Sequence, residues 1–372
     1  MRKIFEGIVV EKLCRAFQIK GEYLGYELMT YGHINKTLKT YFRSEDKTRI
    51  FILQRLNTYV FKKPKGIMSN IISVTEFIRA KMKAKGIENT QRFVLHYCKT
   101  EGGVPYVYDD EGGFWRAYGF IEDSEGINIT DDPFIIEESG RAFGEFQNYL
   151  SDYETDKLFI SIPHFHNTVN RYRIFKEAIT NNFADRKNGV TEEIKEFLAL
   201  EDVATRMYTM QTSGELPLRV THNDTKSNNV LFDVNTHEHL AVIDLDTVMP
   251  GLVGFDYGDA IRFSASSALE DEPDLKKVAL DLKKFEAFTK GFVGEVRSSL
   301  SENEKETLAL GAITMTIEVG VRFLTDYLDG DKYFGTEYPE HNLVRARCQL
   351  ALAKDMIKKV DQMNEIVCKY SN

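Results

Sequence analysis

The chain has 372 residues, which is enough for two domains that share a cleft. Its formal net charge is −9, from 57 acidic and 48 basic residues, and this balance argues against nucleic acid as a partner. No apolar run reaches the roughly 18 residues that a membrane-spanning helix needs, so we expect no membrane segment.

The first part of the chain alternates short apolar stretches with polar turns, which predicts an antiparallel sheet. Residues 1–20 have a loosely helical periodicity, residues 23–28 form the first expected strand, and two further strands flank a polar turn at 44–47. The loop after the first strand contains Gly32. Backbone N–H groups in a loop of this kind can bind phosphate oxygens, so Gly32 is a candidate for nucleotide binding.

The third strand, in the segment FILQRLN at 51–57, should carry a basic side chain that pairs with the phosphates. No lysine is present there, and Arg55 is the candidate because a guanidinium can bridge phosphate oxygens. Gln54 lies beside it. Side chains alternate between the two faces of a strand, so only one of Gln54 and Arg55 can face the cleft, and the sequence leaves that choice open.

A helix and three more strands complete the predicted N-terminal lobe. Apolar spacing predicts the helix near residues 64–85, with Glu76 as a candidate for holding the phosphate-binding residue. The single tryptophan, Trp115, is expected in the core. The expected strands are joined by glycine-containing turns and cover residues 92–98, 102–109 and 112–122.

The segment at 120–124 is the expected crossover between two lobes. Glu122, in this segment, is a further candidate for nucleotide binding. The polar, glycine-containing stretch from residue 125 sets the expected boundary. We therefore predict two lobes, a first at 1–124 that carries the nucleotide-binding candidates and a second at 125–372 that carries the motifs described next.

From Pro133 onward the apolar periodicity is helical. Within this part, the segment SIPHFHN at 161–167 places His164 and His166 around a phenylalanine. No third ligand is nearby, so a structural loop is favoured over a metal site. The main further helices are expected at 169–182, 191–211 and across most of 273–368.

The polar residues of VTHNDTKSNNVLFD, at 220–233, are the strongest functional signal. Asp224 and Asn229 are five residues apart on a turn between two apolar strands, and Asp244 ends a third strand 20 residues after Asp224. Two carboxylates and a carboxamide are what a site for magnesium and a nucleoside triphosphate requires. We predict that Asp224 is the catalytic group that orients the attacking hydroxyl, and that Asn229 and Asp244 are the metal ligands for Mg²⁺.

This spacing is that of the protein-kinase catalytic loop, but His-Asn-Asp and Ile-Asp-Leu-Asp stand in place of His-Arg-Asp and Asp-Phe-Gly. The chain instead resembles the aminoglycoside phosphotransferase-like small-molecule kinases, and within them the N-acetylhexosamine 1-kinases. The resemblance rests on YGHINKT, FILQRLN, HNDTKSNN and RFLTDYLDGDKYF, between Gly32 and Tyr333. It implies an α+β, bilobal protein-kinase-like fold. It also implies an ATP- and Mg²⁺-dependent kinase that phosphorylates the anomeric 1-hydroxyl of GlcNAc or GalNAc.

The same resemblance implies roles for individual residues. Asn35 joins the nucleotide-binding candidates, and His33, Arg322 and Tyr333 are implied to bind the sugar. Asp246 is implied either to contact sugar hydroxyls or only to brace the catalytic loop.

Two further expectations concern the support of this site. Asp256, in the glycine-rich segment after Asp244, is expected to accept backbone N–H bonds and to hold the catalytic turn. Glu318, Arg322 and Asp326 follow each other at intervals of four residues, which places them on one face of a helix that we expect to line a cleft.

Other functions remain open on the sequence alone. A kinase of the same fold could act on an aminoglycoside, an amino alcohol or another sugar, and a pseudokinase would bind nucleotide without catalysis. A protein kinase is disfavoured because Asp-Phe-Gly and Ala-Pro-Glu segments are absent. The expected partner is a small-molecule sugar, with no nucleic acid and no membrane, and a monomer is slightly favoured. Four widely spaced cysteines favour free thiols and a cytoplasmic location.

Overall fold

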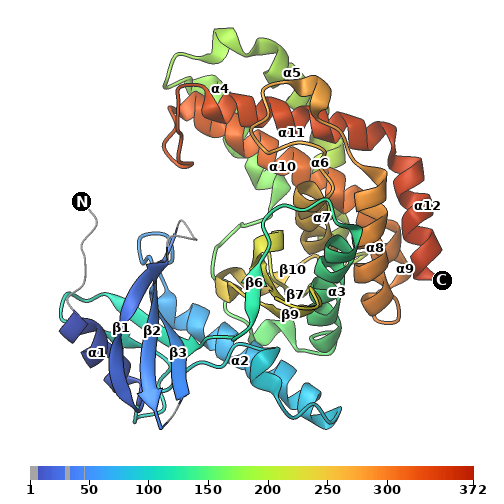
Figure 1. Ribbon diagram of the computed structural model, residues 1–372. Helices are drawn as coiled ribbons and strands as arrows, with labels where there is room; N and C mark the ends of the chain where they lie inside the picture. Colours follow the sequence, from blue (N-terminus) through green and yellow to red (C-terminus); the bar gives the residue numbers. More distant parts are fainter. Residues whose placement is uncertain (1–6, 30–33, 46) are drawn as a thin grey trace.

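The computed structural model describes residues 7–29, 34–45 and 47–372 of the chain. It has an α+β fold with two lobes, a smaller one built on a sheet and a larger one that is mainly helical (Figure 1). The smaller lobe contains a five-stranded antiparallel sheet in the order β1-β2-β3-β5-β4. Its elements are α1 (Gly7–Ala16), β1 (Glu22–Met29), β2 (Lys36–Ser44), β3 (Lys47–Arg55), α2 (Pro64–Ala84), β4 (Val107–Tyr108) and β5 (Phe114–Gly119).

Helices cover both faces of this sheet, and strand alternation sorts the side chains between them. Leu53 and Trp115 are fully buried on the face that packs against α1. Phe114 lies on the opposite face, in a second core that includes the apolar stripe of α2. The predictions of the helix near 64–85 and of a buried Trp115 are confirmed.

The predicted strand at 92–98 is wrong. This segment begins in a short 3-10 helix, Thr90–Arg92, and afterwards pairs with the sheet only at an isolated bridge between Tyr97 and Tyr118. Val94, Leu95 and Tyr97 are all buried in the core beside α2. A short apolar segment resembles a strand in sequence, but here its buried residues fill the space between the helix and the sheet.

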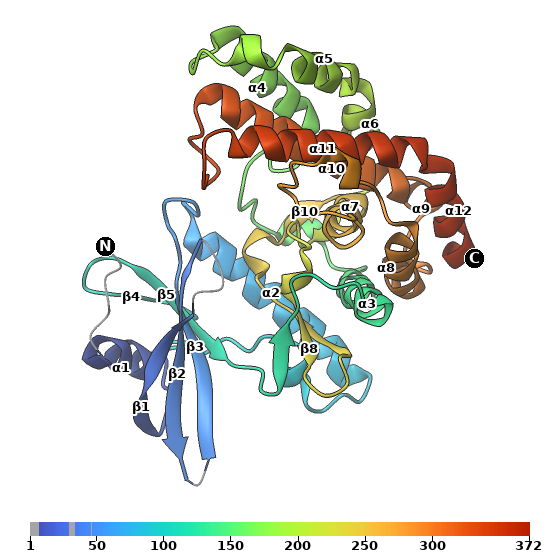
Figure 2. The same ribbon diagram turned by 45° about the horizontal axis from the view of Figure 1, so that its top comes forward.

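The larger lobe carries a small antiparallel sheet, β6-β8-β9, and a two-stranded pair, β10-β7, embedded among helices (Figure 2). The predicted strands around the catalytic motif are confirmed as β7, β8 and β9. The predicted helix at 191–211 is divided in two at Leu200. The elements are β6 (Ser124–Gly126), α3 (Pro133–Tyr149), α4 (Thr168–Asn181), α5 (Thr191–Ala199), α6 (Glu201–Thr212), β7 (Arg219–Thr221), β8 (Val230–Asp233), β9 (His239–Val242), β10 (Met249–Gly251), α7 (Val253–Ser264), α8 (Leu282–Val296), α9 (Glu302–Glu306), α10 (Leu308–Asp329), α11 (His341–Lys358) and α12 (Val360–Ser371).

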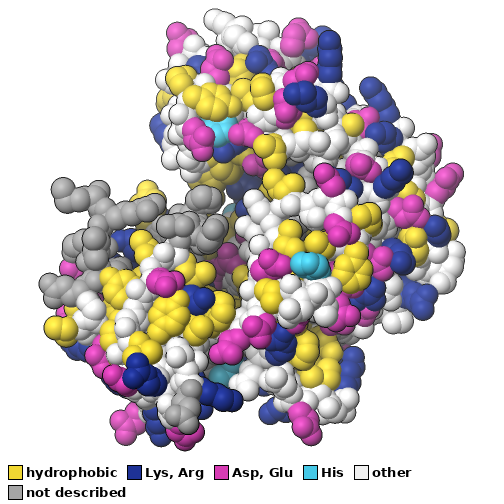
Figure 3. Space-filling view, viewed as in Figure 1, with side chains coloured by type: hydrophobic (Ala, Val, Ile, Leu, Met, Phe, Trp, Pro, Cys, Tyr) yellow, Lys and Arg dark blue, Asp and Glu magenta, His cyan; other side chains and the backbone are white. Residues whose placement is uncertain are grey.

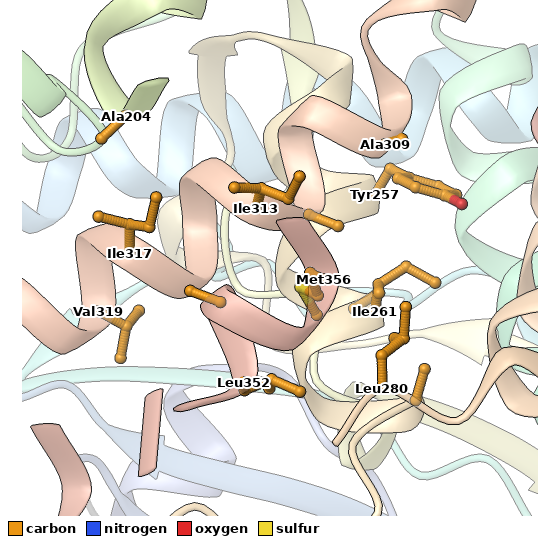
Figure 4. Close-up of a cluster of buried hydrophobic side chains, with 14 of the residues drawn as sticks. Ala204, Tyr257, Ile261, Leu280, Ala309, Ile313, Ile317, Val319, Leu352 and Met356 are labelled. Atoms are coloured by element: carbon orange, nitrogen blue, oxygen red, sulfur yellow. The ribbon is translucent and has the colours of Figure 1, made fainter. Parts of the chain in front are cut away.

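Helix α10 forms the centre of the larger lobe, packed between α7 and α11 (Figure 4). It is the one helix among the described residues that is long and apolar enough to cross a membrane, but 83% of its apolar window is buried inside the protein. Glycines let α7 and α10 approach closely. A Cβ on Gly311 would lie 2.2 Å from the carbonyl oxygen of Gly254, which is far closer than any real contact. This helix is therefore a core helix of the larger lobe.

One side chain of α2 ties the two lobes together. Asn70 is buried and donates to the carbonyl oxygens of Phe159 and Val248, at 2.7 and 2.9 Å, while its own oxygen accepts from the Phe159 N–H at 2.8 Å. Phe159 and Val248 belong to the larger lobe. The groove between the lobes, visible in Figure 3, therefore has a hydrogen-bonded connection at its base.

Candidate active site

A buried carboxylate on α7 anchors the turn after β7 through hydrogen bonds. Asp256 accepts the backbone N–H groups of His222 and Asn223, at 2.8 and 2.7 Å, and the side-chain amide of Gln147 at 2.7 Å. Burial raises the pKa of Asp256, and these donors act in the opposite direction. The expectation that Asp256 supports the catalytic turn is confirmed.

His222 connects this turn to the strand that carries Asp244. Its Nε2 lies 2.8 Å from the carbonyl oxygen of Ile243, which can only accept, so Nε2 carries the proton. The unprotonated Nδ1 then accepts the backbone N–H of Asp224 at 3.3 Å. The ring is fully buried and therefore fixes the distance between the two acidic segments.

The structure brings Asp224, Asn229 and Asp244 together. Asn229 donates from Nδ2 to the Asp224 carbonyl oxygen at 2.8 Å and lies 3.3 Å from the Asp224 carboxylate. The backbone N–H of Ile243, next to Asp244, donates to the Asn229 carbonyl oxygen at 2.9 Å. Since Nδ2 faces the turn, Oδ1 of Asn229 is left to face the opposite side, where a cation can bind.

Asp244 has the electrostatics of a cation-binding group. Its backbone is in the left-handed region, with φ of 59°, and its side chain is open to the cleft. Partial removal from water, together with the negative charges of Asp246 and Asp224, raises the pKa of Asp244 above its usual value. A bound cation would offset this repulsion.

The donor set fits magnesium and does not fit a softer metal. Carboxylate and amide oxygens are the protein ligands that Mg²⁺ takes, and the ion usually keeps water and binds substrate phosphates as well. Among residues 7–29, 34–45 and 47–372 there is no group of three His, Cys, Asp or Glu side chains that could hold a metal by themselves.

Lys226 belongs to the same site, although the sequence reasoning missed it. Its Nζ lies 3.3 Å from Oδ1 of Asp224, and the side chain is half-exposed. Burial lowers the pKa of Lys226, but the charges of Asp224 and Asp259 raise it by more, so the ammonium stays protonated. The available signal was a lysine two residues after the predicted catalytic carboxylate, inside a motif already singled out.

The residues predicted to bind nucleotide differ in where the structure places them. Gly32 lies outside the described residues. Arg55 points away from the acidic cluster, with its Nε 3.8 Å from Asp109 on the α1 side of the sheet. The carbonyl oxygen of Glu122 accepts a hydrogen bond of 2.9 Å from Arg92, and its side chain is exposed. The structure therefore corrects the placement of Arg55, because its strand turns Gln54 and not Arg55 toward the cleft.

Asp246 braces the loop, which is one of the two roles expected for it. One carboxylate oxygen accepts from Asn35 at 2.8 Å, and the other pairs with Arg116 of β5. The side chain is only 2% exposed, so both oxygens are occupied by groups from the smaller lobe. The oxygen of Asn35 in turn accepts the backbone N–H of Asn57 at 2.9 Å, so Asn35, directly before β2, is joined to the segment that follows β3.

On the acceptor side, Arg322 and Tyr333 lie together. The Arg322 guanidinium is 5.8 Å from the ring centre of Tyr333 and 5.3 Å from that of Phe334, and Tyr333 is 72% exposed. Asp326 fixes the segment that carries both rings, because it accepts the backbone N–H groups of Lys332, Tyr333 and Phe334 at 2.8 to 2.9 Å. The remaining acceptor candidate, His33, lies outside the described residues.

The helix face that carries these residues does not line a cleft along its whole length. Glu318 is fully buried, with its carboxylate 3.2 Å from His166 and 3.5 Å from Arg171. Burial raises the pKa of Glu318, but His166 and Arg171 lower it by more. His166 also lies 3.4 Å from the Asn223 carbonyl oxygen, so it links α10 to the catalytic turn. Of the three residues on this face, only Arg322 is partly exposed.

An open cavity of about 190 Å³ adjoins the catalytic turn beside this link. The segment at 161–167, predicted as a structural loop, forms one wall of it. The other walls come from α6, β10 and the start of α7. Its lining includes Phe165, His166, Asn167, Tyr208, Asn223 and Phe255.

Comparison with known proteins places this site in a family. The model of the phosphotransferase enzyme family matches residues 37–289, about two thirds of the chain, and the chain belongs to this family. The match includes the catalytic turn and the strand that ends at Asp244. The class defined by fold and site is thus the small-molecule kinase fold of aminoglycoside, choline and ethanolamine kinases.

Solved structures agree on the fold across the whole chain. An aminoglycoside phosphotransferase from Alicyclobacillus acidocaldarius subsp. acidocaldarius DSM 446 is similar with a TM-score of 0.59 at 10% identity, over 97% of this chain and 98% of that one. Choline kinase from Cryptosporidium parvum Iowa II has a TM-score of 0.55 at 13% identity, over 98% of each chain. A spectinomycin phosphotransferase in complex with ADP and spectinomycin has a TM-score of 0.54 at 14% identity, over 95% and 100%.

Proposed function

We propose that this protein is an ATP-dependent kinase that transfers a phosphoryl group to the anomeric 1-hydroxyl of an N-acetylhexosamine, giving the sugar 1-phosphate. The observation that carries the kinase chemistry is the convergence of Asp224, Asn229 and Asp244. These are the hydroxyl-orienting and metal-binding groups that phosphoryl transfer requires.

Each residue of the site has its own role in the proposed reaction. Asp224 accepts a hydrogen bond from the attacking hydroxyl and takes its proton as transfer proceeds. Because the transition state is largely dissociative, the main contribution of Asp224 is orientation, and no covalent enzyme intermediate is needed. Mg²⁺, when bound to Asn229 and Asp244, would neutralise charge on the phosphate oxygens. Lys226, beside Asp224, supplies a positive charge on the same side.

The choice of a sugar acceptor rests on the motif RFLTDYLDGDKYF and on how its residues are held. Arg322 has no hydrogen bond or ion pair within 4 Å to any described side chain, so its donors are available to sugar hydroxyls or to an acetamido oxygen. The exposed ring of Tyr333 offers an apolar surface on which a pyranose ring can pack. Asp326 holds this segment in place before any acceptor binds.

The deciding experiment measures ADP release over a panel of acceptors. We expect turnover with N-acetylglucosamine or N-acetylgalactosamine, and little or none with aminoglycosides, choline or ethanolamine. Asp224→Asn should reduce kcat by at least about 10²-fold while Mg·ATP still binds, because the amide cannot accept the proton. Asp110→Asn, at an exposed position far from the site, is the matched control and should keep wild-type activity.

Each outcome has a defined meaning. Turnover with an aminoglycoside or an amino alcohol in preference to every sugar would keep the kinase and reject the sugar assignment. Binding of Mg·ATP without turnover of any acceptor would favour a pseudokinase. An Asp224→Asn variant that keeps more than about a tenth of the activity, a loss below about 1.4 kcal/mol, would reject the role of Asp224.

The proposal also covers the cellular location, the oligomeric state and the partner of this protein. All four cysteines are unpaired, which supports a protein of the reducing cytoplasm. We propose a monomer that acts on a small-molecule sugar, without nucleic acid or a membrane as partner.

A further inference from the structure

A row of polar side chains crosses the cleft face of the smaller lobe's sheet. The strand register places Thr37 of β2 opposite Gln54 of β3, and Gln54 opposite Arg116 of β5. On the other face the corresponding row contains Arg55 and Trp115, which both contact Asp109. Gln54 therefore occupies the position from which a strand lysine reaches the phosphates in kinase-like folds.

Arg116 fixes the direction of the Gln54 carboxamide. Its Nε and Nη2 approach one atom of Gln54 at 2.9 and 2.6 Å. A guanidinium can only donate, so this atom must be the amide oxygen. The amide nitrogen then faces the other way and donates to Thr37 Oγ1 at 2.9 Å.

This arrangement leaves one hydrogen of the amide group unused. An amide nitrogen has two donors, and Thr37 accepts one of them. Within residues 7–29, 34–45 and 47–372, no recorded acceptor takes the second, and Gln54 is partly exposed. The second hydrogen is thus available to a ligand in the cleft.

We propose that the Gln54 amide, held by Arg116, is the donor from the smaller lobe to the phosphates of the bound nucleotide. Gln54 thereby takes the position of a phosphate-binding lysine, which the segment FILQRLN lacks. This inference rests on the proposed function, since it assumes a nucleotide in the cleft.

Arg116 is a positioning residue in this arrangement. Its Nη1 pairs with Asp246, two residues from the metal-binding Asp244, and its side chain is 2% exposed. The connection Asp246–Arg116–Gln54 joins the catalytic loop of one lobe to the phosphate-binding strand of the other. It replaces the lysine–glutamate ion pair of kinase-like folds, and Glu76, the sequence candidate for that pair, instead contacts Lys99 at the surface.

The test compares nucleotides that differ only in their phosphates. Gln54→Glu keeps an oxygen for Arg116 but replaces the donating NH₂ with a second acceptor. We expect it to weaken Mg·ATP binding by at least about tenfold, the effect of losing one hydrogen bond to a charged group, and to change adenosine binding by less than about twofold. Arg55→Gln, at the neighbouring position on the opposite face, is the matched control and should bind both ligands as the wild type does.

The role of Arg116 is tested by measuring how its variants bind Mg·ATP and adenosine. Arg116→Gln leaves a buried Asp246 without its partner, so the double variant Arg116→Gln/Asp246→Asn is measured beside it to preserve the charge balance. Both variants should lose more affinity for Mg·ATP than for adenosine, and their folding is checked by circular dichroism. Arg116→Lys should recover only part of the affinity, because an ammonium cannot hold the amide oxygen with two donors.

The outcomes separate this inference from the proposed function. If the wild type binds no Mg·ATP, the proposed function fails. If the wild type binds and turns over ATP while Gln54→Glu binds ATP equally well, the Gln54 inference alone is overturned. Equal losses of ATP and adenosine affinity would also overturn it, because they indicate a general distortion of the cleft.

Discussion

At the scale of single residues, hydrogen-bond chemistry decides what each side chain can still do. The Asn229 amide donates to the Asp224 carbonyl oxygen, which turns its own oxygen away from the turn and toward the position proposed for the metal. Asp246 has both oxygens occupied by protein donors, so it is removed from the set of groups that can bind sugar. The residue types alone would not separate these two roles, since both are common ligands of cations and hydroxyls.

Lys226 gives a prediction at this scale. Its ammonium lies 3.3 Å from Asp224, next to the place where charge develops during transfer. Lys226→Met should lower kcat by about 10²-fold, the usual effect of removing one stabilising donor from a transition state, with a smaller change in the KM for the acceptor.

Steady-state kinetics with ATP and the best acceptor provide the measurement. The control is Lys290→Met, which removes an exposed lysine that pairs with Glu137 on the surface, far from the catalytic turn. A kcat of Lys226→Met within about threefold of the wild type would place Lys226 outside the reaction.

At the scale of elements, a buried ion pair joins the small sheet of the larger lobe to α3. His239 of β9 lies 2.6 Å from Glu138 and 3.4 Å from Glu145. Burial lowers the pKa of His239, but hydrogen bonds to these carboxylates raise it by more, to about 9. Burial raises the pKa of Glu138, but His239 and Arg141 lower it by more, to about 2.

These shifts predict how stability depends on pH. The pKa of His239 is raised above its unfolded value near 6.5, so its contribution is complete below that pH and is lost as the pH rises to 9. The pKa of Glu138 is lowered from 4.5, so its contribution is complete above 4.5 and is lost as the pH falls to 2. The pair therefore stabilises the protein most between about pH 4.5 and 6.5.

His239→Gln should lower the free energy of unfolding by about 1–3 kcal/mol at pH 6, and the difference from the wild type should shrink toward pH 9. Urea unfolding at several pH values measures this. His237→Gln removes a neighbouring histidine whose pair with Glu125 is exposed, and it should have little effect. A constant difference from pH 6 to 9 would contradict the assignment of the ion pair.

At the scale of the whole molecule, the candidate site exists only because the two lobes are held together. The β1–β2 hairpin and β5 reach the catalytic loop through Asn35 and Arg116, and α2 reaches the larger lobe through Asn70. Each link is buried or partly buried and hydrogen-bonded, so the two halves of the cleft are preset relative to each other. A ligand that contacts both halves should therefore stabilise the whole protein.

Mg·ATP should raise the melting temperature. At a ligand concentration of about 100 times Kd, linkage gives about 2.7 kcal/mol of stabilisation, an increase of a few degrees in a chain of this size. ATP with EDTA should give a smaller increase, because the charges of Asp244 and the phosphates then repel each other. The measurement is a thermal shift with Mg·ATP, with ATP and EDTA, and with Mg²⁺ alone.

Asp244→Asn serves as the control for the metal. It should reduce the difference between Mg·ATP and ATP with EDTA, because it removes the carboxylate that binds the cation. If Mg²⁺ makes no difference to the effect of ATP on the wild type, the assignment of Asn229 and Asp244 as metal ligands is wrong.

The sequence alone determined which elements form the catalytic turn and how its three oxygen-bearing residues are spaced, since short strands and tight turns follow from local patterns of apolar and polar residues. Local pattern also identified α2 as a single long helix. Only the tertiary structure decided that Gln54 and not Arg55 faces the cleft, and that Arg116 and Asp246 brace the site. Alternation tells that two neighbours lie on opposite faces of a strand, but which face becomes the cleft depends on where α1, α2 and the larger lobe pack against the sheet.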